Sequence, residues 1–125
     1  FVLLMVLKDY LEQLDDSQKA KLTSNLENLY PNLKWVTTGI IFSEIIVTIY
    51  KDERSLQIFK NLITTEAEDP RGWLAYGLFY FIEECEDRDL KKEAFNLLKS
   101  LLEDKSEFVR YEAKLHIDKL SASNN

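Results

Sequence analysis

Apolar residues recur at intervals of three and four along almost the whole chain, which is typical of helices with one buried face. The spacing breaks at short polar or proline-containing segments, which divide the sequence into seven helical stretches. We expect a capping helix over residues 1–14, helix pairs over 15–50, 52–86 and 88–121, and a frayed tail over 122–125. The pattern therefore predicts an all-α protein.

The ends of these helices carry start and stop residues. Pro31 is expected to stop the second helix. At the start of the fifth helix, we expect Asp69 to be the N-cap and Pro70 the first helical residue. Side chains that can cap a helix N-terminus open four other helices, at Asp15–Ser17, Asp52–Glu53, Asp87–Asp89 and Ser106–Glu107.

One apolar stretch, residues 40–49, can be read in two ways. It is rich in β-branched residues, as strands are, and periodicity alone separates short strands from buried helices poorly. Its length and the lack of a turn leading to a pairing strand favour a buried helix.

The chain also resembles itself at an interval that varies from 36 to 38 residues. Residues 35–40 (WVTTGI) match residues 73–78 (WLAYGL), and a shift of about 36 residues aligns Trp73 and Gly77 with Val109 and Ala113. A glycine inside a helix costs about 1 kcal/mol relative to alanine, so its recurrence suggests a packing role. We expect the small residue to let a neighbouring helix backbone approach closely, although any helical bundle can match itself by chance.

The last unit, residues 89–121, resembles a HEAT repeat. Its second helix begins with residues 106–113 (SEFVRYEA), which are similar to the family's Val-Arg pair followed by alanine. The resemblance implies about three stacked antiparallel helix pairs in a short right-handed α-solenoid, preceded by the capping helix.

Composition agrees with this architecture. The chain has 125 residues, of which 46% are hydrophobic and 30% charged, as in one globular domain. Three glycines and two prolines are too few for the many turns of an all-β fold. The apolar start, residues 1–7, is far shorter than the roughly 20 residues that span a bilayer, so we expect no membrane contact. Either Met5 marks the native start or sequence is missing before it.

Charge and the rare reactive residues exclude several partners and sites. A net charge of −6 repels phosphate backbones, so we expect a basic protein rather than nucleic acid as partner. A single cysteine, Cys85, cannot form an internal disulfide and suits a reducing, cytoplasmic compartment. With a single histidine, His116, the common zinc sites are excluded as well. We expect neither metal nor cofactor.

The sequence carries no catalytic signature, and we expect no enzymatic activity. Glu112 lies one turn before His116, which an ordinary helical pair explains, and no motif brings a serine or cysteine to this histidine. The acidic neighbours of Cys85 disfavour the thiolate that nucleophilic catalysis needs. A carboxylate pair among the 22 acidic residues remains the open route to an enzyme.

Two features are candidates for partner binding. Tyr76 and Tyr80 are expected to point away from the core face of their helix, with Tyr111 in a comparable place on the last helix. Tyrosine is favoured at interfaces, but these rings could equally cover the seams between repeats. The second feature is either a solvated loop or an acidic contact for a basic partner; its carboxylates are Glu83, Glu84, Glu86, Asp87 and Asp89.

These features indicate a non-catalytic protein-binding module that is monomeric when free. In size, charge and helical repeats the chain is similar to small acidic all-α bacterial immunity proteins. That resemblance implies a cytoplasmic inhibitor that neutralises a basic toxin domain, often a nuclease, with electrostatic steering to speed association. The alternative is a scaffold or adaptor segment of a larger helical-repeat protein.

Overall fold

The computed structural model describes residues 2–34 and 36–123, with side chains described over 7–34 and 37–122. This part of the chain is all-helical, as predicted, and contains no strand. Its α-helices are α1 (Val2–Glu12), α2 (Asp16–Leu29), α3 (Val36–Ile49), α4 (Glu53–Leu62), α5 (Glu68–Glu84), α6 (Arg88–Ser100) and α7 (Glu107–Ser123). Two 3₁₀ turns follow α2 and α6, namely η1 (Tyr30–Asn32) and η2 (Leu101–Glu103).

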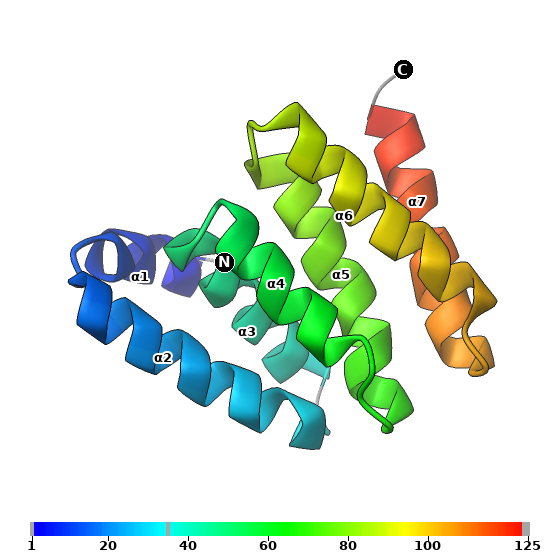
Figure 1. Cartoon of the computed structure of the whole chain (residues 1–125), viewed down its shortest axis with the longest axis horizontal. Coiled ribbons are helices and arrows are strands. Elements are labelled where there is room, and N and C mark those ends of the chain that lie inside the picture. Colours follow the sequence, from blue (N-terminus) through cyan, green and yellow to red (C-terminus); the bar gives the residue numbers. More distant parts are fainter. Residues whose placement is uncertain (1, 35, 124–125) are drawn as a thin grey trace.

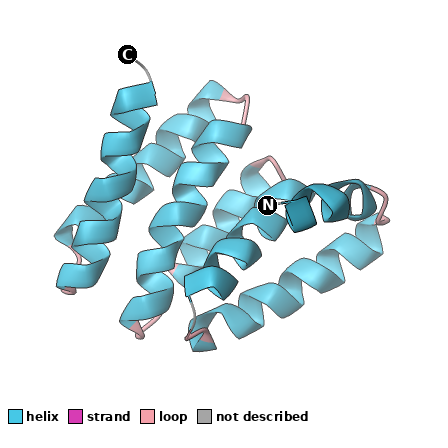
Figure 2. Ribbon diagram, turned by 180° about the vertical axis from the view of Figure 1, so that it is seen from behind, coloured by secondary structure: helices cyan, strands magenta, loops and turns pink. Residues whose placement is uncertain are grey.

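The helices alternate between two layers. Figure 1 shows α2, α4 and α6 in the front layer, with α3, α5 and α7 behind them, and the chain reverses direction from each helix to the next. In the rear layer α5 packs between α3 and α7, while α1 packs against the other side of α3. Figure 2 shows this arrangement from behind. Among α3, α5 and α7, the central helix is therefore α5.

Four of the five predicted N-terminal caps are present. Asp15 accepts a hydrogen bond from the Gln18 backbone N–H at 2.7 Å, and the Gln18 side chain accepts one from the Asp15 N–H in return. Asp52 and Asp87 cap α4 and α6, and the Ser106 hydroxyl accepts from the Val109 N–H at 3.4 Å. Each cap satisfies first-turn N–H groups that have no partner within the helix.

The expected start of α5 is wrong by two residues. The N-cap is Ala67 rather than Asp69, and Pro70 is the third helical residue rather than the first. Proline costs little anywhere in the first turn, because those N–H groups lack helical acceptors. The loop before the helix is held by Arg71, whose Nη1 donates to the carbonyl oxygens of Thr65 at 2.9 Å and Glu66 at 2.6 Å.

Helix α7 extends to Ser123, so it includes the first two residues of the expected frayed tail over 122–125. Residues 124–125, and Trp35 at the expected start of the third helix, lie outside the described residues. The ambiguous stretch 40–49 lies in α3 and is helical, as preferred.

The repeated small residues make room for side chains rather than for a helix backbone, which corrects the expectation from the sequence. A Cβ atom at Gly39 would lie 2.5 Å from Cε3 of Trp73, in the next helix of the rear layer. At Gly77 it would lie 3.0 Å from the Ser43 hydroxyl oxygen and 3.2 Å from the Phe59 ring. The missing side chain at Gly39 therefore leaves the space that the Trp73 ring occupies. Trp73 belongs to a hydrophobic core that extends from α2 to α7.

Candidate protein-binding face

Tyr76 and Tyr80 lie one turn apart on α5, on the same side of the helix. Their rings are stacked, with centroids 6.2 Å apart and planes 13° from parallel, and both side chains are half-buried. Tyr76 contacts both neighbouring helices of the rear layer, through Glu44 of α3 and His116 of α7. The sequence analysis expected both tyrosines to point away from the core; they are half-buried, and Tyr80 also packs against the core.

Helix α3 brings a carboxylate to the tyrosines. Glu44 is only 4% exposed, and one of its carboxylate oxygens accepts a hydrogen bond from the Tyr76 hydroxyl. Burial, this hydrogen bond and the negative charge together raise the pKa of Tyr76 well above its usual range. Thr48, one turn further along α3, donates its hydroxyl to the Glu44 carbonyl oxygen at 2.7 Å, and it acts against the effect of burial on the pKa of Tyr80. We call Glu44, Thr48, Tyr76 and Tyr80 the tyrosine–glutamate cluster.

The hydrogen-bond partner of the Glu44 carboxylate is an uncharged group, the Tyr76 hydroxyl. The ion pairs found among the described residues do not include Glu44. Buried carboxylates are normally paired or strongly hydrogen-bonded, because removing a charge from water is costly. The cluster therefore holds negative charge on a surface that is otherwise aromatic.

Helix α7 closes the other side of Tyr76 with His116. The imidazole is 4% exposed, and its centroid lies 5.7 Å from that of Tyr76 and 5.2 Å from that of Phe79. Its Nε2 atom is 3.6 Å from a carboxylate oxygen of Glu112, and its buried Nδ1 atom has no hydrogen-bond partner. Burial, with help from Lys119, lowers the pKa of His116 to about 4, so the ring is neutral at pH 7.

The run of acidic residues at the end of α5, which we call the acidic turn (residues 83–89), divides into two parts. Glu83, Glu84 and Glu44 all help to raise the pKa of Tyr80, after the larger effect of burial, so two acids of the turn adjoin the tyrosines. Asp87 instead caps α6, accepting from the N–H groups of Asp89 at 2.9 Å and Leu90 at 3.1 Å. The exposed acids are Glu83, Glu86, Asp87 and Asp89, and Glu84 is half-buried.

Tyr111 does not join the tyrosine pair. It is 63% exposed, and the α7 residue whose ring contacts Tyr76 is His116. Positions five residues apart on a helix point about 140° away from one another, so Tyr111 and His116 occupy different faces of α7. Tyr111 therefore points away from the core, as the sequence suggested, but on a face of α7 other than the one that contacts Tyr76.

Sequence reasoning missed Glu44, Thr48 and the aromatic contacts of His116. A signal for Glu44 was present, since it is the only charged residue between positions 35 and 50. A charged residue within an apolar helix is informative, because such residues are rarely buried without a partner. Thr48 carries no comparable signal.

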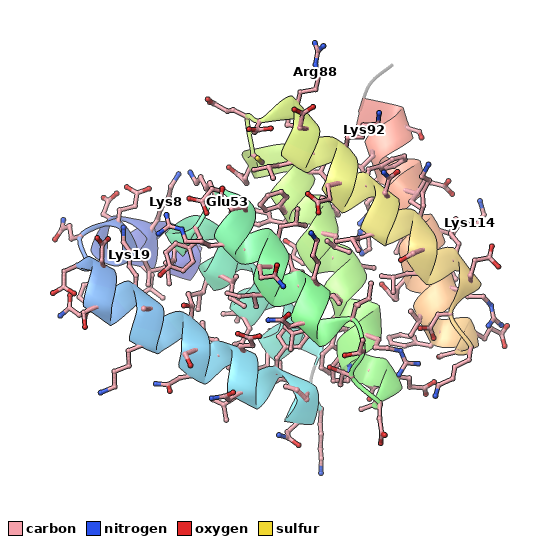
Figure 3. The ribbon with its side chains drawn as sticks, viewed as in Figure 1. Lys8, Lys19, Glu53, Arg88, Lys92 and Lys114 are labelled. Carbon is pink, nitrogen blue, oxygen red and sulfur yellow. The ribbon has the colours of Figure 1, made fainter. Side chains whose placement is uncertain are left out.

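Among the described residues, no three His, Cys, Asp or Glu side chains are grouped so as to hold a metal ion. In Figure 3 the labelled basic side chains point outward from separate helices, with Lys8 on α1, Lys19 on α2, Arg88 and Lys92 on α6, and Lys114 on α7. None of the described helices is long and apolar enough to cross a bilayer.

Comparison with known proteins adds no assignment for this face. No family model, no curated protein and no solved structure matches the chain.

Proposed function

We propose that the protein is a non-catalytic binding module built as a short right-handed solenoid of HEAT-like helix pairs, with α3, α5 and α7 as its binding layer. The alternation of helices between two layers supports this interpretation, since stacked helix pairs produce it. The recurrence of a small residue at Gly39, Gly77 and Ala113, one in each helix of the rear layer, supports it further.

The partner we propose is a basic toxin domain, often a nuclease, which this chain neutralises in the cytoplasm as an immunity protein that is monomeric when free. The single observation that carries the proposal is the stacked pair Tyr76 and Tyr80 beside buried Glu44 and the acids of α5. Aromatic rings supply contact area, and the net charge of −6 would steer a basic partner toward them.

A co-expression experiment tests the immunity role. The C-terminal domain of the protein encoded directly upstream is expressed with and without this chain, and growth is recorded. Toxicity that only this chain relieves supports the proposal and supplies the partner for mapping. Absence of toxicity, or toxicity that persists when both proteins are well expressed, counts against it.

Association kinetics with that partner test the role of the acidic turn. The variant Glu83→Lys/Glu86→Lys should lower the association rate and flatten its dependence on salt, because it reverses the charge of two exposed acids of the acidic turn, of which Glu83 adjoins Tyr80. Asp87 is left intact, since its loss would uncap α6. The control Glu12→Lys/Glu103→Lys changes the net charge equally at two other exposed glutamates. Equal effects of the two variants would contradict a local role.

The alternative function, a scaffold segment of a larger helical-repeat protein, is favoured by one observation on α7. Tyr111 is 63% exposed and Leu115 is 36% exposed, one turn further along, so the two form an apolar strip that another helix pair could cover. A scaffold edge predicts self-association that Tyr111→Ser/Leu115→Ser abolishes in sedimentation velocity. A monomer at all accessible concentrations would oppose it.

A further inference from the structure

We propose that the tyrosine–glutamate cluster binds one arginine side chain of the protein partner, with the guanidinium against the Glu44 carboxylate and the Tyr76 and Tyr80 rings. This inference deepens the proposed function, because it names the chemical group that the same face recognises.

Charge complementarity is the first step. Glu44 is 4% exposed, forms no ion pair with a described residue, and is held by the neutral Tyr76 hydroxyl. Breaking or omitting one half of a buried ion pair is costly, so an uncompensated carboxylate favours a bound cation. His116 does not supply that cation, since its low pKa leaves the nearest imidazole neutral at pH 7.

Ring geometry is the second step. Tyr76 and Tyr80 are stacked 13° from parallel and only half-buried, so the pair retains accessible aromatic surface next to Glu44. A cation over an aromatic face is attracted by the ring quadrupole. A planar guanidinium can stack on the ring while its N–H groups point at a carboxylate, whereas the compact ammonium of lysine cannot do both.

The chain already contains such an arrangement. The Arg54 guanidinium carbon lies 4.1 Å from the centroid of the Tyr50 ring, while Nε and Nη2 donate to the two Asp52 carboxylate oxygens at 3.1 and 2.7 Å. A tyrosine and a carboxylate together can therefore satisfy a single guanidinium. At the tyrosine–glutamate cluster the tyrosines and the carboxylate are present, and the arginine is not.

The test uses a minimal probe rather than the toxin. N-acetyl-arginine amide is titrated into the full chain and followed by two-dimensional NMR, with N-acetyl-citrulline amide as a neutral probe of the same shape. We expect shifts centred on Tyr76 and Tyr80, and an affinity for the arginine probe at least about tenfold above that for citrulline. Equal affinity for the two probes, or shifts centred elsewhere, would overturn the proposal.

Two substitutions localise the effect. Glu44→Gln keeps an acceptor for the Tyr76 hydroxyl and should lower the affinity for the arginine probe at least about fivefold. Its control is Glu53→Gln, an exposed glutamate on α4 that removes the same charge and should leave the affinity within about 1.5-fold (Figure 3). Equal effects of both would contradict the site. If Glu44→Gln does not fold, the affinity of Tyr80→Leu for the arginine probe and the comparison with the citrulline probe still test the site.

This experiment separates the arginine site from the immunity role. Arginine selectivity without relief of toxicity would leave the site standing and overturn the immunity function. Relief of toxicity by a chain that binds both probes equally would support the immunity function and overturn the arginine site.

Discussion

Arg71 and Asp104 form a two-pronged ion pair across 33 residues of sequence. Nε and Nη2 of Arg71 each lie 2.9 Å from a different carboxylate oxygen of Asp104, and the arginine is only 4% exposed. Asp104 also accepts a hydrogen bond from the Ser106 N–H at 2.8 Å, next to the start of α7. The pair therefore fixes the beginning of α5 against the turn that leads into α7.

Removal of one partner from this pair should be strongly destabilising. Asp104→Asn leaves a buried guanidinium without its counter-charge, and we expect the free energy of unfolding to fall by about 3 kcal/mol or more. The exposed pair of Lys114 and Asp118 provides the control, since Asp118→Asn should change stability by less than about 0.5 kcal/mol. Urea unfolding followed by circular dichroism measures both. Similar losses in the two variants would show that the buried pair contributes little.

The free energy of unfolding should decrease as the pH is lowered, because of His116. Its pKa is lowered to about 4 in the folded protein, so between pH 6.5 and 4 the unfolded chain binds a proton that the folded chain does not. Lys119 opposes protonation of the ring, the Glu112 carboxylate at 3.6 Å favours it, and Tyr76 and Phe79 cover it from α5.

The measurement compares the wild-type chain with His116→Gln from pH 7 to pH 4. The wild type should lose up to about 3 kcal/mol more than the variant over this range. Glu112 acts in the opposite direction, because its raised pKa lets the folded state take up a proton earlier, and it is present in both proteins. Parallel pH profiles would contradict the assignment to His116.

Gly39→Ala should destabilise the protein although alanine favours helix. The new Cβ atom would lie 2.5 Å from the Trp73 ring, which is 5% exposed and has little room to move. Overpacking typically costs about 1 to 3 kcal/mol, which exceeds the gain of about 1 kcal/mol in helix propensity. Thr37→Ala, at an exposed position of α3, controls for propensity and should not destabilise. Thermal unfolding that shows Gly39→Ala more stable than wild type would refute the packing argument.

Tyr76→Phe should cost about 1 to 3 kcal/mol, because it removes the hydroxyl that hydrogen-bonds the buried Glu44 carboxylate. Tyr111→Phe removes a hydroxyl from a side chain that is 63% exposed, and we expect almost no change. Denaturant unfolding of both variants gives the comparison. If Tyr76→Phe left the free energy of unfolding unchanged, water would be replacing the hydroxyl without penalty.

The sequence predicted local features better than contacts between helices. Caps such as Asp15 and Ser106 depend on residues three positions apart, and the helical interpretation of residues 40–49 depends on apolar spacing, so both could be read directly. The pairing of Glu44 with Tyr76 joins residues 32 positions apart and depends on how α3 and α5 are rotated against each other. Periodicity identifies the buried face of a helix but does not fix which side chains meet across it.

Cys85 lies at the end of α5, 2% exposed, with its sulfur 3.9 Å from the Asp87 carbonyl oxygen. A thiol reagent can reach this sulfur only when the junction between α5 and α6 opens. Since the chain contains a single cysteine, its labelling rate under native conditions measures how often that junction separates, and no cysteine has to be introduced for the experiment. The same rate reports whether a bound partner slows this local opening at the end of the helix that carries Tyr76 and Tyr80.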